Sequence, residues 1–293
     1  MFIDIHSHLI LFPTCPRPSD GKQPYPTPEV MLEYYDGIGV DKSIMLPVVS
    51  PDSNYRCQSN DEIFEIHRRY PDRFIPFCNM DPRNMRNTPD AKMEYVMKYY
   101  RDKGCRGVGE LTANMAMDDP RVHNLFRAAE CAGLPVTIHI GTQIGGMYGL
   151  VDEAGLPKLE EVLQKFPDLK IFGHSQPFWA EMSQNPTRAE RNGYPKGKVI
   201  EGRVAELMRK YPNLYGDLSA GSGCNALMRD EEYGIRFLNE FQDRLMFGID
   251  NYSTPDDPPG LMVYLKKLLA DKKISQELFD KVTHGNAIRI LDL

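Results

Sequence analysis

The sequence begins with Met1-Phe2-Ile3-Asp4-Ile5-His6-Ser7-His8, an apolar run that carries two histidines two positions apart. Side chains alternate between the two faces of a β-strand, so a strand over this run places His6 and His8 on the same face. Two neutral imidazoles that point into one small volume are typical of half a site for zinc or a similar divalent ion. Taken alone, the pair fits a chance arrangement on a solvated edge strand equally well, so the fold has to supply further ligands.

Short apolar or β-branched runs alternate with longer amphipathic runs along the whole chain, which is typical of a parallel sheet covered by helices. The predicted strands cover Phe2–His6, Ser43–Val49, Phe74–Asn79, Gly107–Leu111, Pro135–Ile140, Leu169–His174, Leu214–Ser219 and Leu245–Asp250. The predicted helices cover Pro28–Gly37, Asp61–Tyr70, Asp90–Lys103, Pro120–Ala132, Lys158–Phe166, Val199–Tyr211, Glu231–Phe241, Pro258–Ala270 and a terminal segment from Gln276. Eight strands, each followed by a helix, predict a single α/β domain over residues 1–293, a (β/α)8 TIM barrel.

A doubly wound open sheet is the alternative architecture. Such a sheet, when it binds a dinucleotide, carries a Gly-x-Gly-x-x-Gly turn after its first strand, whereas residues 11–27 here form a polar, proline-rich loop. Two long loops follow predicted strands: the glycine-rich Gly141–Pro157 and the polar Ser175–Lys198. In a barrel both lie on the face that carries active sites, where we expect them to serve as lids.

The composition restricts the class of partner. Hydrophobic residues make up 41% of the chain and charged residues 26%, and no apolar run is long enough to cross a bilayer. The formal net charge is -6 with both signs interspersed, so no basic field is present to attract nucleic acid. We therefore expect a small-molecule substrate, neither a nucleic-acid nor a membrane partner, and a homodimer as the commonest association. The amino terminus lacks the features of an export signal, which favours a cytoplasmic location.

Ionisable residues stand at the carboxyl ends of five predicted strands. In a parallel barrel these ends meet on one rim, so we expect six side chains to face one cavity: His6, His8, Glu110, His139, His174 and Asp250. Burying six ionisable groups together is costly unless they are paired or neutralised, and a divalent metal ion removes that cost. The six residues are therefore the predicted metal ligands. Their histidines favour Zn2+, with Mn2+ as an alternative.

The same residues resemble a known family. The motif Asp4-Ile5-His6-Ser7-His8, followed by Glu110, His139, His174 and Asp250 and by Gly285-Asn286-Ala287-Ile288-Arg289, is similar to the amidohydrolase superfamily. More narrowly it resembles the amidohydrolase-related branch, which also contains enzymes of the aminocarboxymuconate-semialdehyde decarboxylase and γ-resorcylate decarboxylase types. The resemblance covers essentially the whole chain.

The resemblance implies a role for each residue. His6, His8 and Asp250 match the ligands of one metal, and His139 matches a ligand of that ion or of a second one. Glu110 stands where many relatives carry a bridging lysine carbamate or glutamate. His174 matches a histidine that binds the second metal in binuclear members and acts as an acid/base group in mononuclear ones. Decarboxylase-like members generally lack a ligand on the fourth strand, so Glu110 favours a hydrolytic centre.

The leading hypothesis is a hydrolase that uses a metal-activated water to cleave a small amide, ester or lactone. In it Asp250 accepts the proton of the water, and His174 binds a second ion or stabilises the oxyanion. Asp4, or more weakly Asp217, is expected to support the ligands from below. Phe178 and Trp179 offer an apolar wall for the substrate, although plain packing explains them equally well.

Two alternatives remain. A non-oxidative decarboxylase of a small aromatic or unsaturated acid would use an arginine on the rim, and the candidates on predicted loops are Arg56, Arg83, Arg188 and Arg191. A non-catalytic metal-binding barrel would instead close its site with four protein ligands.

Overall fold

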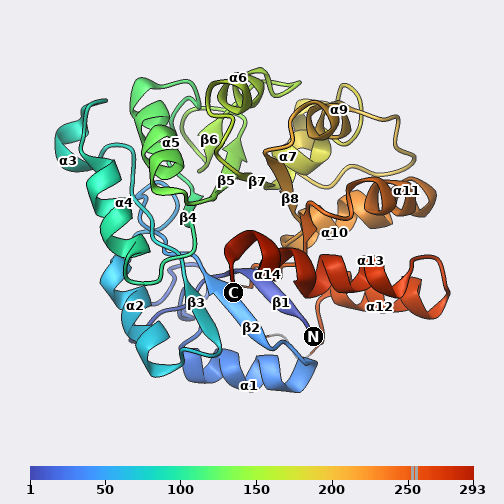
Figure 1. Cartoon of the computed structure of the whole chain (residues 1–293), viewed down its shortest axis with the longest axis horizontal. Coiled ribbons are helices and arrows are strands. Elements are labelled where there is room, and N and C mark those ends of the chain that lie inside the picture. Colours follow the sequence, from blue (N-terminus) through green and yellow to red (C-terminus); the bar gives the residue numbers. More distant parts are fainter. Residues whose placement is uncertain (252–253, 255–256) are drawn as a thin grey trace.

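The computed structural model describes residues 1–251, 254 and 257–293. Within these residues, eight parallel strands form a barrel that is surrounded by helices (Figure 1). The barrel strands are β1 (Ile3–Ser7), β2 (Lys42–Met45), β3 (Phe74–Pro76), β4 (Val108–Leu111), β5 (Val136–Gly141), β7 (Ile171–His174), β8 (Leu214–Asp217) and β9 (Leu245–Met246). A further short strand, β6 (Leu150–Val151), pairs with the end of β5.

Backbone hydrogen bonds close the barrel where its two ladders, β1-β2-β3 and β4-β5-β7-β8-β9, are separated. Between β3 and β4, the Cys78 amide donates to the Gly107 carbonyl oxygen at 3.0 Å. Between β1 and the segment after β9, the Ile5 amide donates to the Phe247 carbonyl oxygen at 3.1 Å. The two ladders therefore join into one ring, and the predicted (β/α)8 barrel is confirmed.

The helices of the described chain include all nine that the sequence predicts, with ends that differ by a few residues. They are α1 (Pro28–Ile38), α2 (Asn60–Arg69), α3 (Asn84–Asn87), α4 (Met93–Arg101), α5 (Pro120–Ala132), α6 (Pro157–Lys165), α7 (Gln176–Ala180), α8 (Arg188–Arg191), α9 (Arg203–Lys210), α10 (Ala220–Met228), α11 (Glu231–Phe241), α12 (Gly260–Ala270), α13 (Gln276–Asp280), the π-helix η1 (Lys281–Gly285) and α14 (Asn286–Leu291). No helix in this part of the chain combines the length and the apolar character needed to cross a bilayer.

Helix α5 has the predicted ends because both of its caps form. The Asp119 carboxylate accepts a hydrogen bond from the Arg121 amide at 2.9 Å, which satisfies a free donor of the first turn. Gly133, with φ of 70°, adopts the left-handed conformation that ends the helix. The sequence did not predict α10, because its run Ala-Gly-Ser-Gly-Cys-Asn-Ala-Leu-Met holds two poor helix formers and no apolar period.

The long loops are partly structured. The predicted loop Gly141–Pro157 carries β6, and the predicted loop Ser175–Lys198 carries α7 and α8. Helix α7 begins where the Ser175 hydroxyl accepts from the Phe178 amide. These elements were not predicted, because two to five residues are too few to show a periodic pattern.

Strand β9 is shorter than predicted. The ladder stops at Met246, and beyond it the Ile249 amide donates to the Asp4 side chain at 2.8 Å instead of to a neighbouring strand. Asp250 then takes a positive φ of 57°, while its amide still donates to the His6 carbonyl oxygen at 2.9 Å. Asp250 therefore belongs to the turn above the strand, where its side chain meets the end of β1.

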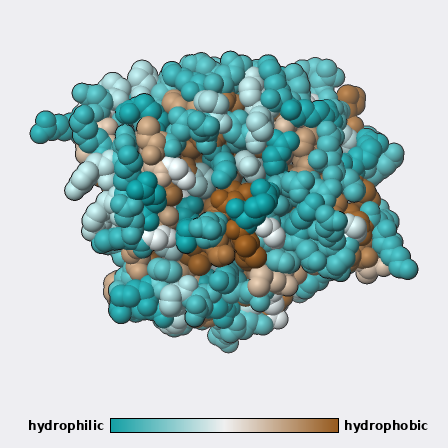
Figure 2. All heavy atoms as spheres, in the orientation of Figure 1, coloured by the Kyte–Doolittle hydropathy of each residue, from teal (hydrophilic) through white to brown (hydrophobic). Residues whose placement is uncertain are grey.

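Helix α14 packs on a hydrophobic cluster inside the barrel. Its buried Ala287, Ile290 and Leu291 join strand residues that include Ile5 and Met246. Figure 2 shows hydrophilic side chains over most of one face of the molecule, with hydrophobic ones gathered near its middle, where Figure 1 places α14. The carboxyl-terminal helix therefore covers an apolar core between the strands.

Candidate metal centre

All six predicted ligands come together at the carboxyl ends of the strands. His6 lies on β1, Glu110 on β4, His139 on β5 and His174 at the end of β7, and the remaining two follow β1 and β9. The six side chains form three groups in which one nitrogen or oxygen atom from each residue lies within 4.8 Å of the others: His6, His8 and Glu110; His6, His174 and Asp250; and Glu110, His139 and His174. The six residues therefore lie close together, as the sequence predicts, and four of them (His8, Glu110, His139 and Asp250) line the cavity described below.

Glu110 lies at the middle of the cluster. Its Oε2 is 3.6 Å from Nε2 of both His6 and His8, and its Oε1 is 3.7 Å from Nε2 of His174. The Nδ1 of His139 is 2.6 Å from the same Oε1, which is a hydrogen-bond distance. Burial disfavours the charged carboxylate, but the imidazoles of His139 and His6 hold the pKa of Glu110 well below its ordinary value.

Asp250 closes the cluster from the cavity side. Its Oδ1 lies 3.6 Å from Nε2 of His6 and 3.5 Å from Nε2 of His8, and its Oδ2 lies 3.5 Å from Nε2 of His174. The Asp250 side chain is 25% exposed, whereas the other five residues of the cluster are buried. It is therefore the member of the cluster that a molecule in the cavity can reach most easily.

The remaining ring nitrogen of each central histidine has its own partner. Nδ1 of His6 is 2.6 Å from Asp217 Oδ2, and Nδ1 of His8 is 2.9 Å from the Leu46 carbonyl oxygen. Nδ1 of His174 is 3.0 Å from the Ser219 hydroxyl. These contacts turn all three Nε2 atoms toward the centre, which is the arrangement by which outer partners orient metal-binding imidazoles.

Asp4 does not support the histidines as expected. Its carboxylate accepts hydrogen bonds from the amides of His6 and Ile249 and from the Tyr35 hydroxyl, and it contacts neither imidazole. The pairing of β1 with β2 shifts register between Asp4 and Ser7, so the simple alternation used for the prediction does not hold there. Burial raises the pKa of Asp4 to about 7. Asp217, the weaker candidate, is the carboxylate that contacts an imidazole.

The spacing of the cluster fits a divalent cation. Ligand bonds of about 2.0–2.1 Å at tetrahedral angles place neighbouring ligand atoms about 3.4 Å apart. The Nε2 atoms of His6 and His8 are 3.2 Å apart, and both lie 3.5 or 3.6 Å from Oδ1 of Asp250. Burial and the neighbouring His6 lower the pKa of His8, which favours the neutral form that binds metals. Imidazole and carboxylate donors of this kind suit zinc and manganese.

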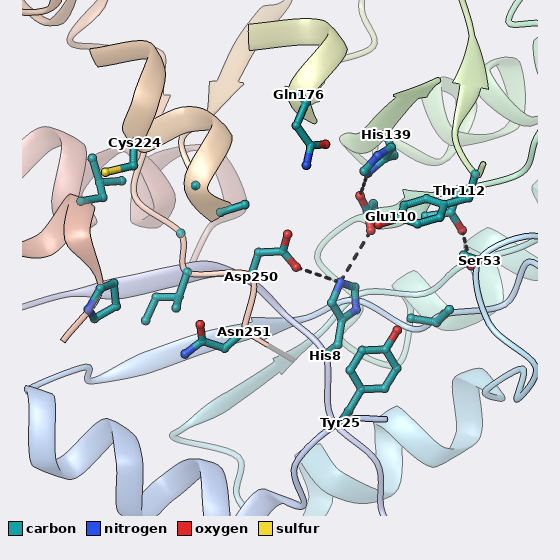
Figure 3. Close-up of a pocket in the computed structure, with 18 of the residues that line it drawn as sticks. His8, Tyr25, Ser53, Glu110, Thr112, His139, Gln176, Cys224, Asp250 and Asn251 are labelled. Carbon is teal, nitrogen blue, oxygen red and sulfur yellow. Dashed lines mark hydrogen bonds and ion pairs between the residues drawn. The ribbon is translucent and has the colours of Figure 1, made fainter. Parts of the chain in front are cut away.

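A cavity of about 530 Å3 opens above the cluster (Figure 3). His8, Glu110, His139 and Asp250 line it, so the predicted ligands face a space of the size that small-molecule sites occupy. No lysine or arginine lines it among the residues that the structure describes.

The predicted rim arginines have other partners. Arg56 pairs with Glu62 at 3.0 Å, and Arg83 pairs with Asp52 and Asp81. Arg191 is buried and pairs with Glu181 at 3.0 Å, and Arg188 contacts Gln143. None of the four lines the cavity, so the expected cue for a decarboxylase is missing from the described structure.

Of the two explanations for Phe178 and Trp179, the structure supports plain packing and not an apolar wall of the cavity. Phe178 and Trp179 are buried below the rim, where Trp179 donates to the Asp217 carbonyl oxygen at 2.9 Å, and neither lines the cavity. The aromatic side chains that line it are instead Tyr25, Tyr148 and Tyr194, which the sequence did not single out. No motif marks these tyrosines, because each reaches the cavity from an irregular loop.

Tyr25 and Tyr148 each lie against an imidazole of the cluster. The ring centroid of Tyr25 lies 5.3 Å from that of His8, and that of Tyr148 lies 4.5 Å from that of His139. Burial raises the pKa of Tyr25 to about 12, so its hydroxyl stays protonated at neutral pH.

Comparisons with known proteins agree with this fold. The chain is similar to an uncharacterised TIM-barrel protein from Bordetella bronchiseptica, with 21% identity, a TM-score of 0.69 and coverage of 99% of this chain and 98% of that one. It is similar to 5-carboxyvanillate decarboxylase from Novosphingobium aromaticivorans in complex with manganese and 4-hydroxy-3-methoxy-5-nitrobenzoic acid. The identity is 20% and the TM-score 0.59, with coverage of 90% of this chain and 79% of that one. It is also similar to a probable 2-pyrone-4,6-dicarboxylic acid hydrolase from Acinetobacter baumannii, with 13% identity, a TM-score of 0.59 and coverage of 100% of this chain and 99% of that one.

These structural similarities establish the fold. No match was found among curated proteins. A family model described as amidohydrolase, however, matches residues 3–293, which is nearly the whole chain. The protein therefore belongs to the amidohydrolase family.

Proposed function

We propose that the protein is a metal-dependent hydrolase that cleaves a small amide, ester or lactone with an activated water molecule. The position of Glu110 is the observation that carries this proposal. Its Oε2 faces His6 and His8, and its Oε1 faces His139 and His174. In a decarboxylase, the carboxylate of the substrate has to approach such a centre. Glu110 already places a carboxylate there, and the two negative charges would repel each other.

The proposed ligands of one ion are His6, His8 and Asp250, with Glu110 Oε2 as the fourth. Zn2+ is the metal that this donor set favours. Mn2+ is the alternative, because the related decarboxylase structure from Novosphingobium contains manganese. A second ion would use Glu110 Oε1 and the imidazoles of His139 and His174.

A divalent ion bound at this centre supplies Lewis-acid polarisation of the substrate carbonyl and lowers the pKa of water to about 7. Asp250 accepts the proton of the attacking water, because its carboxylate borders both the cluster and the cavity. It then passes this proton to the leaving group. His174, held by the Ser219 hydroxyl, faces Asp250 Oδ2 and keeps that carboxylate oriented toward the cavity.

Metal content and turnover measured together test the proposal. The purified wild type is analysed for bound metal, and a panel of neutral lactones, esters and amides is screened for hydrolysis. We expect at least one equivalent of metal, and an Asp250→Asn variant that loses about 10²–10⁴-fold in kcat while its melting temperature stays close to that of the wild type. A Glu110→Gln variant shows whether a second equivalent depends on the central carboxylate.

The same samples separate the alternatives. Release of CO2 from a small aromatic or unsaturated acid, with no hydrolysis, would support the decarboxylase. Bound metal without turnover of either kind would support a non-catalytic barrel, and in that case Asp250→Asn would mainly lower stability. A protein that binds no metal after reconstitution would contradict all three.

A further inference from the structure

The cavity above the cluster has two chemically different ends. The imidazole and carboxylate side chains that line it are His8, Glu110, His139 and Asp250, and all belong to the cluster. Figure 3 shows Cys224 on the far side of Asp250 from Glu110 and His139. The cavity therefore extends from the cluster, past Asp250, to a second end at Cys224.

Small and apolar residues from two helices form the end at Cys224. Cys224 lies on α10, and Gly260 and Leu261 begin α12. A Cβ atom added to Gly260 would lie 3.4 Å from Cys224 Sγ, so the two helices are in contact at this point. Leu261 and Ile249, which also line the cavity, are buried at 2% and 5% exposure. The polar groups nearby are the Asn251 amide and the Tyr194 hydroxyl, which lies 3.0 Å from the position of a Cβ at Gly221. The rest of this end presents carbon and sulfur atoms to a ligand.

None of the described residues at this end carries a positive charge. No lysine or arginine of the described residues lines the cavity, and the sequence has neither type at positions 252, 253, 255 and 256. A carboxylate placed beside Cys224 and Leu261 would lose water and gain no cationic partner, which is unfavourable. A methyl or phenyl group placed there would gain from leaving water.

We propose that the substrate places its reacting carbonyl at the cluster and an uncharged, apolar group at the Cys224 end. The assignment of the reacting group rests on the proposed function. The substrate class is therefore a neutral ester, lactone or amide with an apolar substituent, rather than a dicarboxylic acid. The preference for a neutral substrate over a dicarboxylic acid follows from the residues at the Cys224 end. It does not depend on which reaction the cluster catalyses.

Two matched probes test this assignment by binding. 4-Methylbenzamide and 4-carbamoylbenzoate share the amide and the ring, and they differ only in a methyl group against a carboxylate at the opposite end. Their Kd values are measured by calorimetry on the metal-loaded wild type. We expect 4-methylbenzamide to bind roughly tenfold tighter or better. Equal or tighter binding of 4-carbamoylbenzoate, or no binding of either compound, overturns the proposal.

A variant with a positive charge at position 224 tests whether the preference for the uncharged probe arises at the Cys224 end. Cys224 is half-buried, so Cys224→Arg can extend its charge along the cavity, and Cys224→Met adds comparable length without charge. We expect Cys224→Arg to reduce or reverse the preference for 4-methylbenzamide, and Cys224→Met to keep it. Identical behaviour of the two variants overturns the placement at Cys224. If Cys224→Arg does not fold, the wild-type comparison still decides the charge preference.

Failure of the proposed reaction gives a different result. If hydrolysis is absent for every neutral compound while 4-methylbenzamide binds with the expected preference, the hydrolase proposal falls and the assignment of the apolar end stands. If hydrolysis occurs and is fastest with a carboxylate at the far end of the substrate, the reaction stands and the apolar assignment falls.

Discussion

Oδ2 of Asp217 lies 2.6 Å from Nδ1 of His6, although 211 positions separate the two residues, and both side chains are fully buried. The imidazole of His6 therefore carries a proton on Nδ1 and directs Nε2 toward the cluster. Burial disfavours a charged Asp217, but the neighbouring His6 and His174 hold its pKa below the ordinary value. The pair thus sets the orientation of a proposed ligand from below.

Asp217→Asn is expected to weaken metal binding by about 10- to 100-fold, because outer partners of metal-binding histidines usually contribute that much. The amide keeps the shape of the side chain but does not fix the same ring orientation. Metal affinity is measured by competition with a chromophoric chelator. Asp152→Asn is the matched control, because Asp152 is also buried but its carboxylate binds backbone amides at the start of α6. An unchanged affinity in Asp217→Asn would contradict this role.

Gln176→Met tests a side chain whose amide has no hydrogen-bond partner within the described structure. Gln176 is half-buried, and Figure 3 shows its amide pointing into the cavity between Asp250 and His139. A net hydrogen bond contributes about 0.5–1.5 kcal/mol, so we expect kcat/KM to fall roughly three- to tenfold. The melting temperature should not change, because no internal bond is lost.

The control for Gln176 is Gln184→Met, on the same loop but outside this cavity. We expect it to leave kcat/KM at the wild-type value. A loss of equal size in both variants would show that the loop, and not the amide of Gln176, is responsible.

Asp119→Ala is expected to lower the free energy of unfolding by about 1 kcal/mol at neutral pH, because it removes the cap of α5. Hydrogen bonds from Arg121 lower the pKa of Asp119 below its ordinary 3.8. A lowered pKa in the folded state means that the charged form stabilises the fold above about pH 3.8 and that this contribution is lost as the pH falls through the folded-state value. Thermal unfolding should therefore show this difference in the free energy of unfolding between wild type and Asp119→Ala at pH 7, and a smaller difference near pH 3. The stability of Asp119→Asn, whose side chain can still cap the helix, should lie between those of the wild type and Asp119→Ala.

The sequence predicts well that these six residues lie close together, because the topology of the barrel brings them to one rim. Any ionisable residue at the end of a parallel strand, such as Glu110 or His174, reaches the same rim of a barrel. The outer partners do not follow from such a rule. Asp4 fails because β1 shifts register beside it, and the pairing of Asp217 with His6 is a contact between distant strands that no local pattern reports. The walls of the cavity are hardest to predict, since irregular loops place Tyr25 and Tyr148.

Gly149→Ala and Gly145→Ala compare two glycines of the loop that carries Tyr148. Both have positive φ, 106° and 81°, so both variants strain the backbone. A Cβ at Gly145 meets nothing within 4 Å, whereas a Cβ at Gly149 would lie 2.8 Å from the Gly141 amide nitrogen and 2.9 Å from His139 Cδ2. Strain alone costs about 1 kcal/mol, which corresponds to roughly 2–4 °C in Tm for a chain of this size class.

We therefore expect Gly145→Ala to lower Tm by only this amount and to keep the metal affinity of the wild type. Gly149→Ala should lower Tm further and, because the added carbon pushes against the imidazole of His139, it should also disturb the hydrogen bond between His139 Nδ1 and Glu110 Oε1. If a second ion is bound at Glu110, His139 and His174, metal content drops in Gly149→Ala and stays constant in Gly145→Ala. If only one ion is bound at His6, His8 and Asp250, the metal content is equal in both variants, and Gly149→Ala shows its effect in Tm and kcat. Elemental analysis beside thermal unfolding thus distinguishes the two forms of the centre without altering any proposed ligand.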